Sequence, residues 1–132
     1  MEKSSIVELF FQFERIDNHS MALRINNELV ESNEQGMAQM SLAVNFPSVL
    51  ELKVSGKSMN KDTVLDSAGN IVADKHIKLI RATVDRLPVP DRYLERWPEL
   101  NGNKTNYFGF NGIIKLNFDA TDSFKWMLKC MT

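Results

Sequence analysis

The sequence VELFFQFE at positions 7–14 alternates apolar and polar side chains along most of its length. Successive side chains of a β-strand point to opposite faces, so this pattern predicts a strand whose Val7, Leu9, Phe11 and Phe13 face a core. Phe10 falls on the otherwise polar phase. Its position predicts that this strand is covered on both of its faces.

The same two-residue period recurs along most of the chain, in segments around residues 21–25, 40–46, 50–54, 77–84 and 114–118. Turn-forming clusters separate these segments roughly every eight to twelve residues, which is typical of sandwiches and barrels. Asn26-Asn27 and the stretch 66–70 predict hairpin turns, and Asn111-Gly112 gives the strongest hairpin signal. We therefore predict an all-β fold, an antiparallel β-sandwich of jelly-roll type, with a closed barrel as the second choice.

Residues 87–100 interrupt the alternation. Pro88, Pro90 and Pro98 fall here, and proline cannot donate to a sheet ladder, so this segment is not a central strand. Residues 91–97 predict one short helix of about two turns within a long loop, with Asp91 as its N-cap and Pro98 as its stop.

The last segment again alternates, which predicts a final strand that buries Phe124, Trp126, Leu128 and Cys130. A buried Cys130 is an inert thiol. Met127 and Met131 fall on the opposite phase of this strand. Together with Phe10 they predict a contact surface for a protein partner or a second copy, with a covering loop of the same chain as the alternative.

Composition limits the class of protein. A chain of 132 residues, 43% of them hydrophobic, fits one domain spanning residues 1–132. The 16 basic and 17 acidic residues form no basic stripe, which argues against nucleic acid as a partner. No apolar stretch approaches the roughly 20 residues of a membrane span. The lone cysteine and the absence of a signal peptide predict a soluble protein made in the cytoplasm.

The sequence offers no set of catalytic residues. His19 lies in a turn cluster and His76 beside a strand start, and we interpret both as solvated polar residues. No strained nucleophile elbow or zinc-binding spacing is present. Gly56-Lys57-Ser58 ends like a P-loop, but Glu51 stands where the first glycine belongs. We therefore predict that the chain is not an enzyme.

One cluster of oxygen-bearing side chains suggests calcium. Asn60, Asp62, Asp66, Asn70 and Asp74 fall within fifteen residues, and hard cations take such ligands in loops. The spacing does not match an EF-hand. The alternative interpretation is a hairpin in which Asp66 and Asn70 cap their own turn, with no cofactor involved.

Four aromatic side chains are candidates for carbohydrate binding, because they lie in or near irregular segments where a flat ring can stack on a sugar. They are Tyr93, Trp97, Tyr107 and Phe108. The alternative is that Tyr93 and Trp97 fasten the long loop to the core, since both side chains suit half-buried sites.

The segments KDTVLDSAGNIVAD (61–74) and YFGFNG (107–112) resemble small β-sandwich proteins encoded by tailed bacteriophages. This resemblance implies a virion accessory part or a carbohydrate-binding module, and it carries over no functional residue. We predict a non-enzymatic structural or interaction module, in the form of a decoration or tail-associated protein assembled into a virion. The alternative is a carbohydrate-binding module assisted by calcium.

Overall fold

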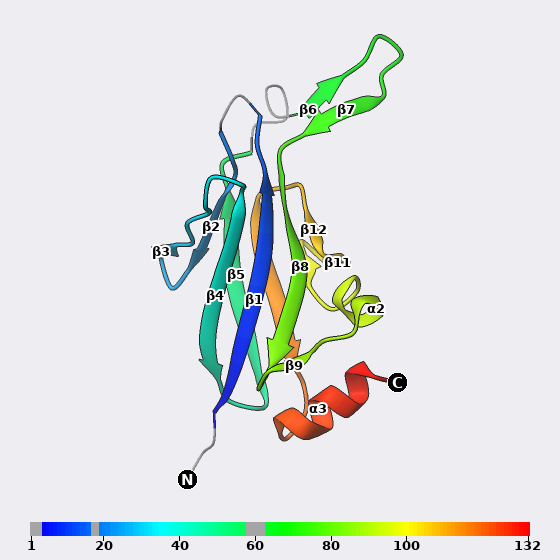
Figure 1. Cartoon of the computed structure of the whole chain (residues 1–132). Coiled ribbons are helices and arrows are strands. Elements are labelled where there is room, and N and C mark those ends of the chain that lie inside the picture. Colours follow the sequence, from blue (N-terminus) through cyan, green and yellow to red (C-terminus); the bar gives the residue numbers. More distant parts are fainter. Residues whose placement is uncertain (1–3, 17–18, 58–62) are drawn as a thin grey trace.

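The computed structural model describes residues 4–16, 19–57 and 63–132, which form two antiparallel sheets packed face to face (Figure 1). One sheet has the order β12–β8–β1–β4, with β9 also paired to β8. Its strands are β1 (Ser5–Glu14), β4 (Met37–Val44), β8 (His76–Val84), β9 (Leu87–Pro88) and β12 (Tyr107–Phe108).

The second sheet has the order β11–β10–β13–β5–β2–β3. Its strands are β2 (Ala22–Ile25), β3 (Glu28–Leu29), β5 (Ser48–Ser55), β10 (Glu99–Leu100), β11 (Asn103–Lys104) and β13 (Gly112–Phe118). A separate hairpin of β6 (Thr63–Leu65) and β7 (Ile71–Asp74) projects from one end of the sandwich (Figure 1). The chain passes repeatedly from one sheet to the other, and the predicted all-β sandwich is confirmed.

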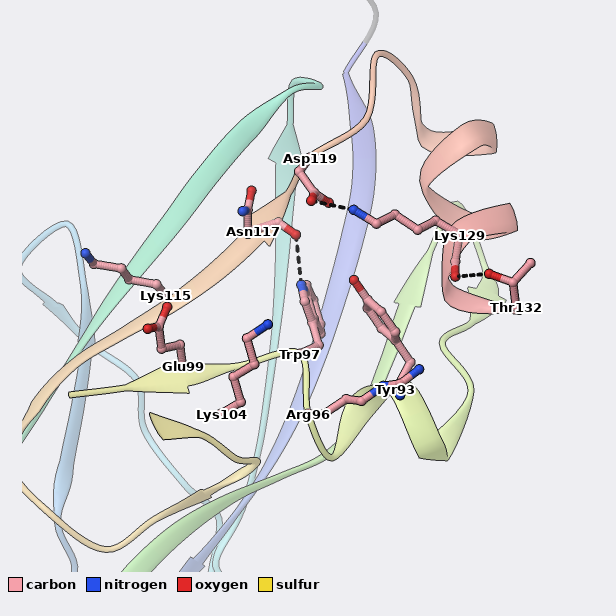
Figure 2. Close-up of a pocket in the computed structure, with 10 residues that line it drawn as sticks. All are labelled: Tyr93, Arg96, Trp97, Glu99, Lys104, Lys115, Asn117, Asp119, Lys129 and Thr132. Carbon is pink, nitrogen blue, oxygen red and sulfur yellow. Dashed lines mark hydrogen bonds and ion pairs between the residues drawn. The ribbon is translucent and has the colours of Figure 1, made fainter. Parts of the chain in front are cut away.

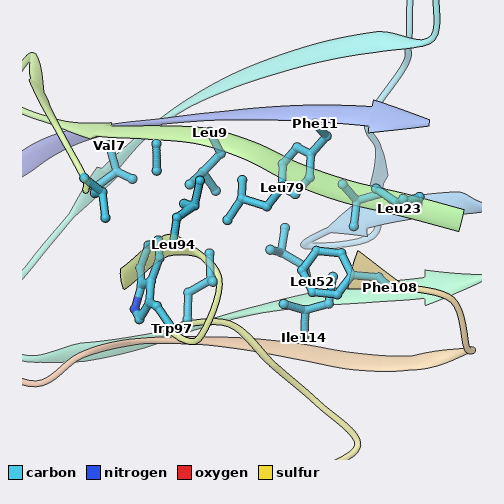
Figure 3. Packing of buried hydrophobic residues seen from close by; sticks show 14 of the residues in the cluster. Val7, Leu9, Phe11, Leu23, Leu52, Leu79, Leu94, Trp97, Phe108 and Ile114 are labelled. Carbon is cyan, nitrogen blue, oxygen red and sulfur yellow. The ribbon is translucent and has the colours of Figure 1, made fainter. Parts of the chain in front are cut away.

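The core lies between the two sheets, where the alternating apolar residues of both inner faces meet (Figure 3). The predicted inner face of β1 is fully or almost fully buried, as are Leu52 of β5 and Ile114 of β13. Phe10 points to the other side of β1, where the guanidinium carbon of Arg81 lies 5.4 Å from its ring centroid. This cation–π contact explains how an aromatic side chain is tolerated on the outer face.

Two of the predicted turns form where expected. Asn26 and Asn27, with φ of 51° and 67°, join β2 to β3, and the stretch 66–70 joins β6 to β7. The hairpin predicted at Asn111-Gly112 is wrong, because β12 pairs with β8 in one sheet and β13 pairs with β5 in the other. Burial of Phe108 in the core, as part of the first sheet, overrides the local turn preference.

The short helix predicted near 91–97 is confirmed as α2 (Asp91–Leu94). Pro90, not Asp91, occupies the N-cap position, and no side chain caps this end. The chain continues in a further turn, in which the Trp97 N–H donates to the Tyr93 carbonyl over 2.8 Å.

The final segment is a helix, α3 (Ser123–Cys130), and the predicted strand is wrong. Asp122 caps the helix by accepting the Lys125 N–H over 2.8 Å. Trp126, Met127 and Cys130 are buried, but Phe124 and Leu128, which were predicted to be core, are 69% and 49% exposed. None of the described helices is long and apolar enough to cross a membrane.

An aromatic cluster fastens α3 and the 87–100 loop to the end of the sandwich. It consists of Phe46, Tyr93, Trp97, Phe118 and Trp126, with neighbouring ring centroids 5.1 to 6.3 Å apart. The indole N–H groups of Trp97 and Trp126 both donate to the Asn117 carbonyl, over 2.9 and 3.3 Å. This arrangement confirms the prediction that Trp126 belongs to the core.

The helical register of α3 makes a prediction about stability. Replacing Trp126 with Ala removes a fully buried ring, and we expect this to lower the free energy of unfolding by about 3–5 kcal/mol. The matched change of Phe124 to Ala alters an exposed ring and should cost less than about 0.5 kcal/mol. Urea titrations at neutral pH measure both values. Similar losses for the two variants would contradict the helix and favour a strand.

Candidate functional site

A hollow of about 500 Å³ opens on the side of the molecule where α2, α3 and the second sheet meet (Figure 2). Its lining comes from four parts of the chain: the α2 turn, the β10–β11 hairpin, β13 with the residue that follows it, and the C-terminal end of α3. The lining residues are Tyr93, Arg96, Trp97, Glu99, Lys104, Lys115, Asn117, Asp119, Lys129 and Thr132.

Tyr93 and Trp97 supply the aromatic part of the hollow. Their rings lie 6.3 Å apart and are nearly parallel, with an interplanar angle of 27°. Trp97 is buried and held by its bond to the Asn117 carbonyl, while Tyr93 is half-buried. Burial, reinforced by negative charge nearby, raises the pKa of Tyr93 to about 12. Its hydroxyl therefore stays protonated at neutral pH.

A row of alternating charges crosses the outer face of the second sheet and enters the hollow. Glu99 pairs across strands with Lys104 on one side and with Lys115 on the other, and Lys115 is opposite Glu51. Opposite charges in directly facing positions stabilise a sheet by roughly 0.2–1 kcal/mol per pair. Lys104 is the last residue of this row, because β11 is the edge strand of the sheet.

The other charged groups of the hollow are also ordered. Lys129 of α3 forms an ion pair with Asp119, and the hydrogen bond from Lys129 lowers the pKa of Asp119. The Arg96 guanidinium carbon lies 5.9 Å from the ring centroid of Tyr93. Within the described part of the chain, Asn117 forms hydrogen bonds through its backbone carbonyl and forms none through its side-chain amide. The hollow thus presents charged and amide groups around an aromatic base.

A second polar cluster lies at the base of the β6–β7 hairpin. The Asp74 carboxylate accepts hydrogen bonds from the Lys57 ammonium, from the Thr63 hydroxyl over 2.8 Å and from the Tyr107 hydroxyl over 2.5 Å. The His76 ring stacks on Tyr107 with centroids 4.2 Å apart. The Lys57 side chain is only 2% exposed, so its charge is compensated inside the protein.

The pKa of Asp74 reflects opposing effects. Burial alone would raise it, but the hydrogen bonds from Lys57, Tyr107 and Thr63 lower it below the ordinary value. Burial, together with the hydrogen bond that Tyr107 donates to Asp74, raises the pKa of Tyr107. The cluster is therefore an ionised carboxylate held by three donors, and it joins the hairpin to the sandwich.

The three predicted calcium ligands that the structure describes do not lie together. Asn60 and Asp62 lie outside the described residues. Asp66 and Asn70 lie at the tip of the hairpin, where the Asp66 carboxylate accepts the Ala68 and Asn70 N–H groups, and Asp74 lies at the base. Within residues 4–16, 19–57 and 63–132, no three acidic, histidine or cysteine side chains are arranged to hold a metal. These bonds match the alternative interpretation, in which Asp66 and Asn70 cap their own turn.

The four predicted sugar-binding aromatics lie in two places. Tyr93 and Trp97 meet in the hollow, whereas Tyr107 and Phe108 belong to β12 beside the β6–β7 base. Phe108 is fully buried and Trp97 nearly so, and neither offers a free ring face. Tyr93 and Trp97 also fasten the loop to the core, as the alternative interpretation proposed.

The predicted interface residues also separate. Phe10 lies on the outer face of β1. Met127 lies on the buried face of α3, whereas Met131 is 69% exposed. Met127 therefore contacts the core of its own chain, because the segment is helical. Cys130 is buried as predicted, and burial raises its pKa to about 12, which agrees with an inert thiol.

Sequence reasoning missed most of the hollow. Lys104, Lys115, Asn117, Asp119 and Lys129 were not singled out, because single polar residues on an alternating strand look like solvent-facing positions. The one usable signal was the proline-rich loop, which breaks the alternation and carries Tyr93 and Trp97.

The sequence matches no protein-family model and no curated protein. One solved structure is similar in fold, the selenomethionine form of vCBM60, described with a circular permutation that links two families of calcium-dependent carbohydrate-binding modules. The TM-score is 0.48, with 7% sequence identity over 86% of this chain and 91% of that one. At that level the likeness carries no functional argument, so the proposals below rest on this chain's own residues, and the virion role stays a prediction.

The cluster at Asp74 predicts a pH-dependent stability. Because its folded pKa is depressed, Asp74 stabilises the fold at pH values above its unfolded pKa of about 3.9, and this contribution is lost as the pH falls through the folded pKa. Asp74→Asn should therefore lower the free energy of unfolding by about 1–3 kcal/mol at pH 7. The difference from the unaltered protein should shrink below about pH 4.

Urea titrations between neutral and acid pH test this expectation. Asp91→Asn, at an exposed position of α2, makes the same change of charge without altering the cluster, and it serves as the control. A difference between Asp74→Asn and the unaltered protein that stays constant down to pH 2–3 would show that Asp74 is not held ionised by its three donors.

Proposed function

We propose that this chain is a non-catalytic carbohydrate-binding module whose ligand occupies the hollow. The observation that carries the proposal is the composition of that hollow, in which Tyr93 and Trp97 lie beneath a ring of charged and amide side chains. Binding sites generally combine an apolar base with a few convergent polar groups that fix orientation.

A sugar matches this lining because each hydroxyl both donates and accepts hydrogen bonds, while the C–H face of the ring is apolar. The Asn117 amide supplies two donors and one acceptor oxygen, the Asp119 carboxylate accepts, and Lys104 donates. The partly exposed Tyr93 side chain offers an apolar contact at the base of the hollow, and its hydroxyl remains a donor.

The same groups favour binding over catalysis. A general acid needs a carboxyl group that holds its proton near neutral pH, whereas the bond from Lys129 lowers the pKa of Asp119. Tyr93, with a pKa of about 12, is a poor general base. The titratable groups of the hollow with shifted pKa values are therefore fixed in one protonation state, which suits recognition.

The exposed amide of Asn117 provides a clean test. Asn117→Ala removes the side chain from the hollow and keeps the backbone carbonyl that holds both indoles, so the fold is retained. After a glycan array has identified a ligand, we expect this variant to bind it roughly two- to tenfold more weakly, the effect of about one hydrogen bond. Isothermal titration calorimetry measures the affinity.

The matched control is Asn103→Ala, at an exposed position of β11 outside the hollow, which should bind like the unaltered protein. Equal weakening by the two variants would place the ligand elsewhere. No binding to any glycan on the array would overturn the proposed function.

A second candidate function, self-association, is favoured by the outer face of α3. Phe124, Leu128 and Met131 are exposed and spaced four and three residues apart, which places them in one stripe. Two copies packed antiparallel along this stripe would bury these three apolar side chains in one contact.

Analytical ultracentrifugation at micromolar concentration tests this second candidate. We expect a dimer that Leu128→Ser converts to monomer, and that Val49→Ser, an equally exposed apolar position on β5, leaves intact. A monomer in the unaltered protein would contradict self-association.

A further inference from the structure

The hollow carries more positive than negative charge, although the chain as a whole has a formal net charge of −1. Four cationic side chains line it, Arg96, Lys104, Lys115 and Lys129, against the two carboxylates of Glu99 and Asp119. Like-signed charge gathered in a concave site attracts a ligand of the opposite sign more strongly than on a flat surface.

The cations are not equally available. Lys129 is paired with Asp119, and Lys115 lies between Glu99 and Glu51 in the cross-strand row. Within the described part of the chain, Lys104 and Arg96 form no ion pair and no hydrogen bond through their side chains. Among the described residues Lys115 forms no direct ion pair either, but it faces two carboxylates, whereas Lys104 faces only Glu99. Lys104 and Arg96 are therefore the least compensated cations of the hollow.

Their placement sets where an anionic group would bind. Lys104 ends the alternating row at the β11 edge, and its charge acts on Asp119 across the hollow, contributing to the lowered pKa of that carboxyl. Arg96 lies over the Tyr93 ring, at the base. In Figure 2 both side chains lie below Asn117 and Asp119, with Lys104 on one side of Trp97 and Arg96 on the other.

We propose that the hollow binds an acidic saccharide, with the acid group at Lys104 and Arg96 and the apolar side of the sugar against the exposed part of the Tyr93 side chain. This inference rests on the proposed function and specifies its ligand class. A neutral sugar would leave both cations without an ion pair. A simple anion would use the cations and leave the aromatic base and the Asn117 amide without a role.

Four probes of similar length separate the possible outcomes: an oligogalacturonate, a sulfated oligosaccharide, a neutral xylo-oligosaccharide and oligoglutamate. Calorimetry of the full chain should show binding of a uronate or a sulfated saccharide, identifying which acid group is used. We expect no comparable binding of the neutral sugar or of oligoglutamate. Affinity for the acidic sugar should fall as salt rises from about 50 to 500 mM, since exposed charges are screened.

Lys104→Gln should weaken binding of the acidic sugar by roughly twofold to fivefold, as expected for one exposed charge pair. The matched control is Lys125→Gln, which removes the same charge from an exposed position of α3 outside the hollow and should have no effect. Urea titration of both variants checks that they fold.

The outcomes distinguish the two proposals. Preference for the neutral sugar would overturn the acidic-ligand inference and leave the proposed function in place. Equal binding of oligoglutamate, or equal effects of the two lysine variants, would show non-specific charge attraction and overturn the inference as well. Absence of binding to all three saccharides, together with a negative glycan array, would overturn the proposed function itself.

Discussion

The backbone carbonyl of Asn117 is the point on which one end of the molecule depends. β10 pairs with β13 only at Ile114 and Lys115, so the edge of β13 beyond them has no neighbouring strand. The indole N–H groups of Trp97 and Trp126 take the place of that strand by donating to the Asn117 carbonyl. One loop and one helix are thereby attached to an open sheet edge, and the aromatic rings that carry the donors complete the core.

The hollow follows from this attachment. Because β10 is short and the α2 turn and α3 dock beside it, a corner remains between the sheet face and the two helical segments (Figures 1 and 2). Buried rings hold the base rigid, whereas charged side chains at the rim remain exposed. A rigid base with an adaptable polar rim limits the ordering cost of binding, since only the rim side chains lose freedom.

The opposite end of the sandwich is built on charge. There the Asp74 carboxylate joins Lys57, Thr63 and Tyr107, and so connects the projecting β6–β7 hairpin to the two sheets. An isolated two-stranded hairpin is only marginally stable in water, so the β6–β7 hairpin depends on this cluster for its stability. The molecule therefore has an apolar attachment at the end that forms the hollow and a polar attachment at the end that carries the hairpin.

The sequence by itself determined the sandwich, because the two-residue alternation in segments such as 7–14 leaves each strand one apolar face to bury. It also determined the turn at Asn26-Asn27, whose residues tolerate positive φ. Only the tertiary structure decided the last segment, since the pattern of 124–130 fits a strand and a helix. The helix is the form that buries Met127 beside Trp126 in the core and leaves Phe124 exposed. The tertiary structure alone decided the hollow too, because Tyr93, Lys104, Asn117 and Lys129 belong to separate elements that local sequence cannot place side by side.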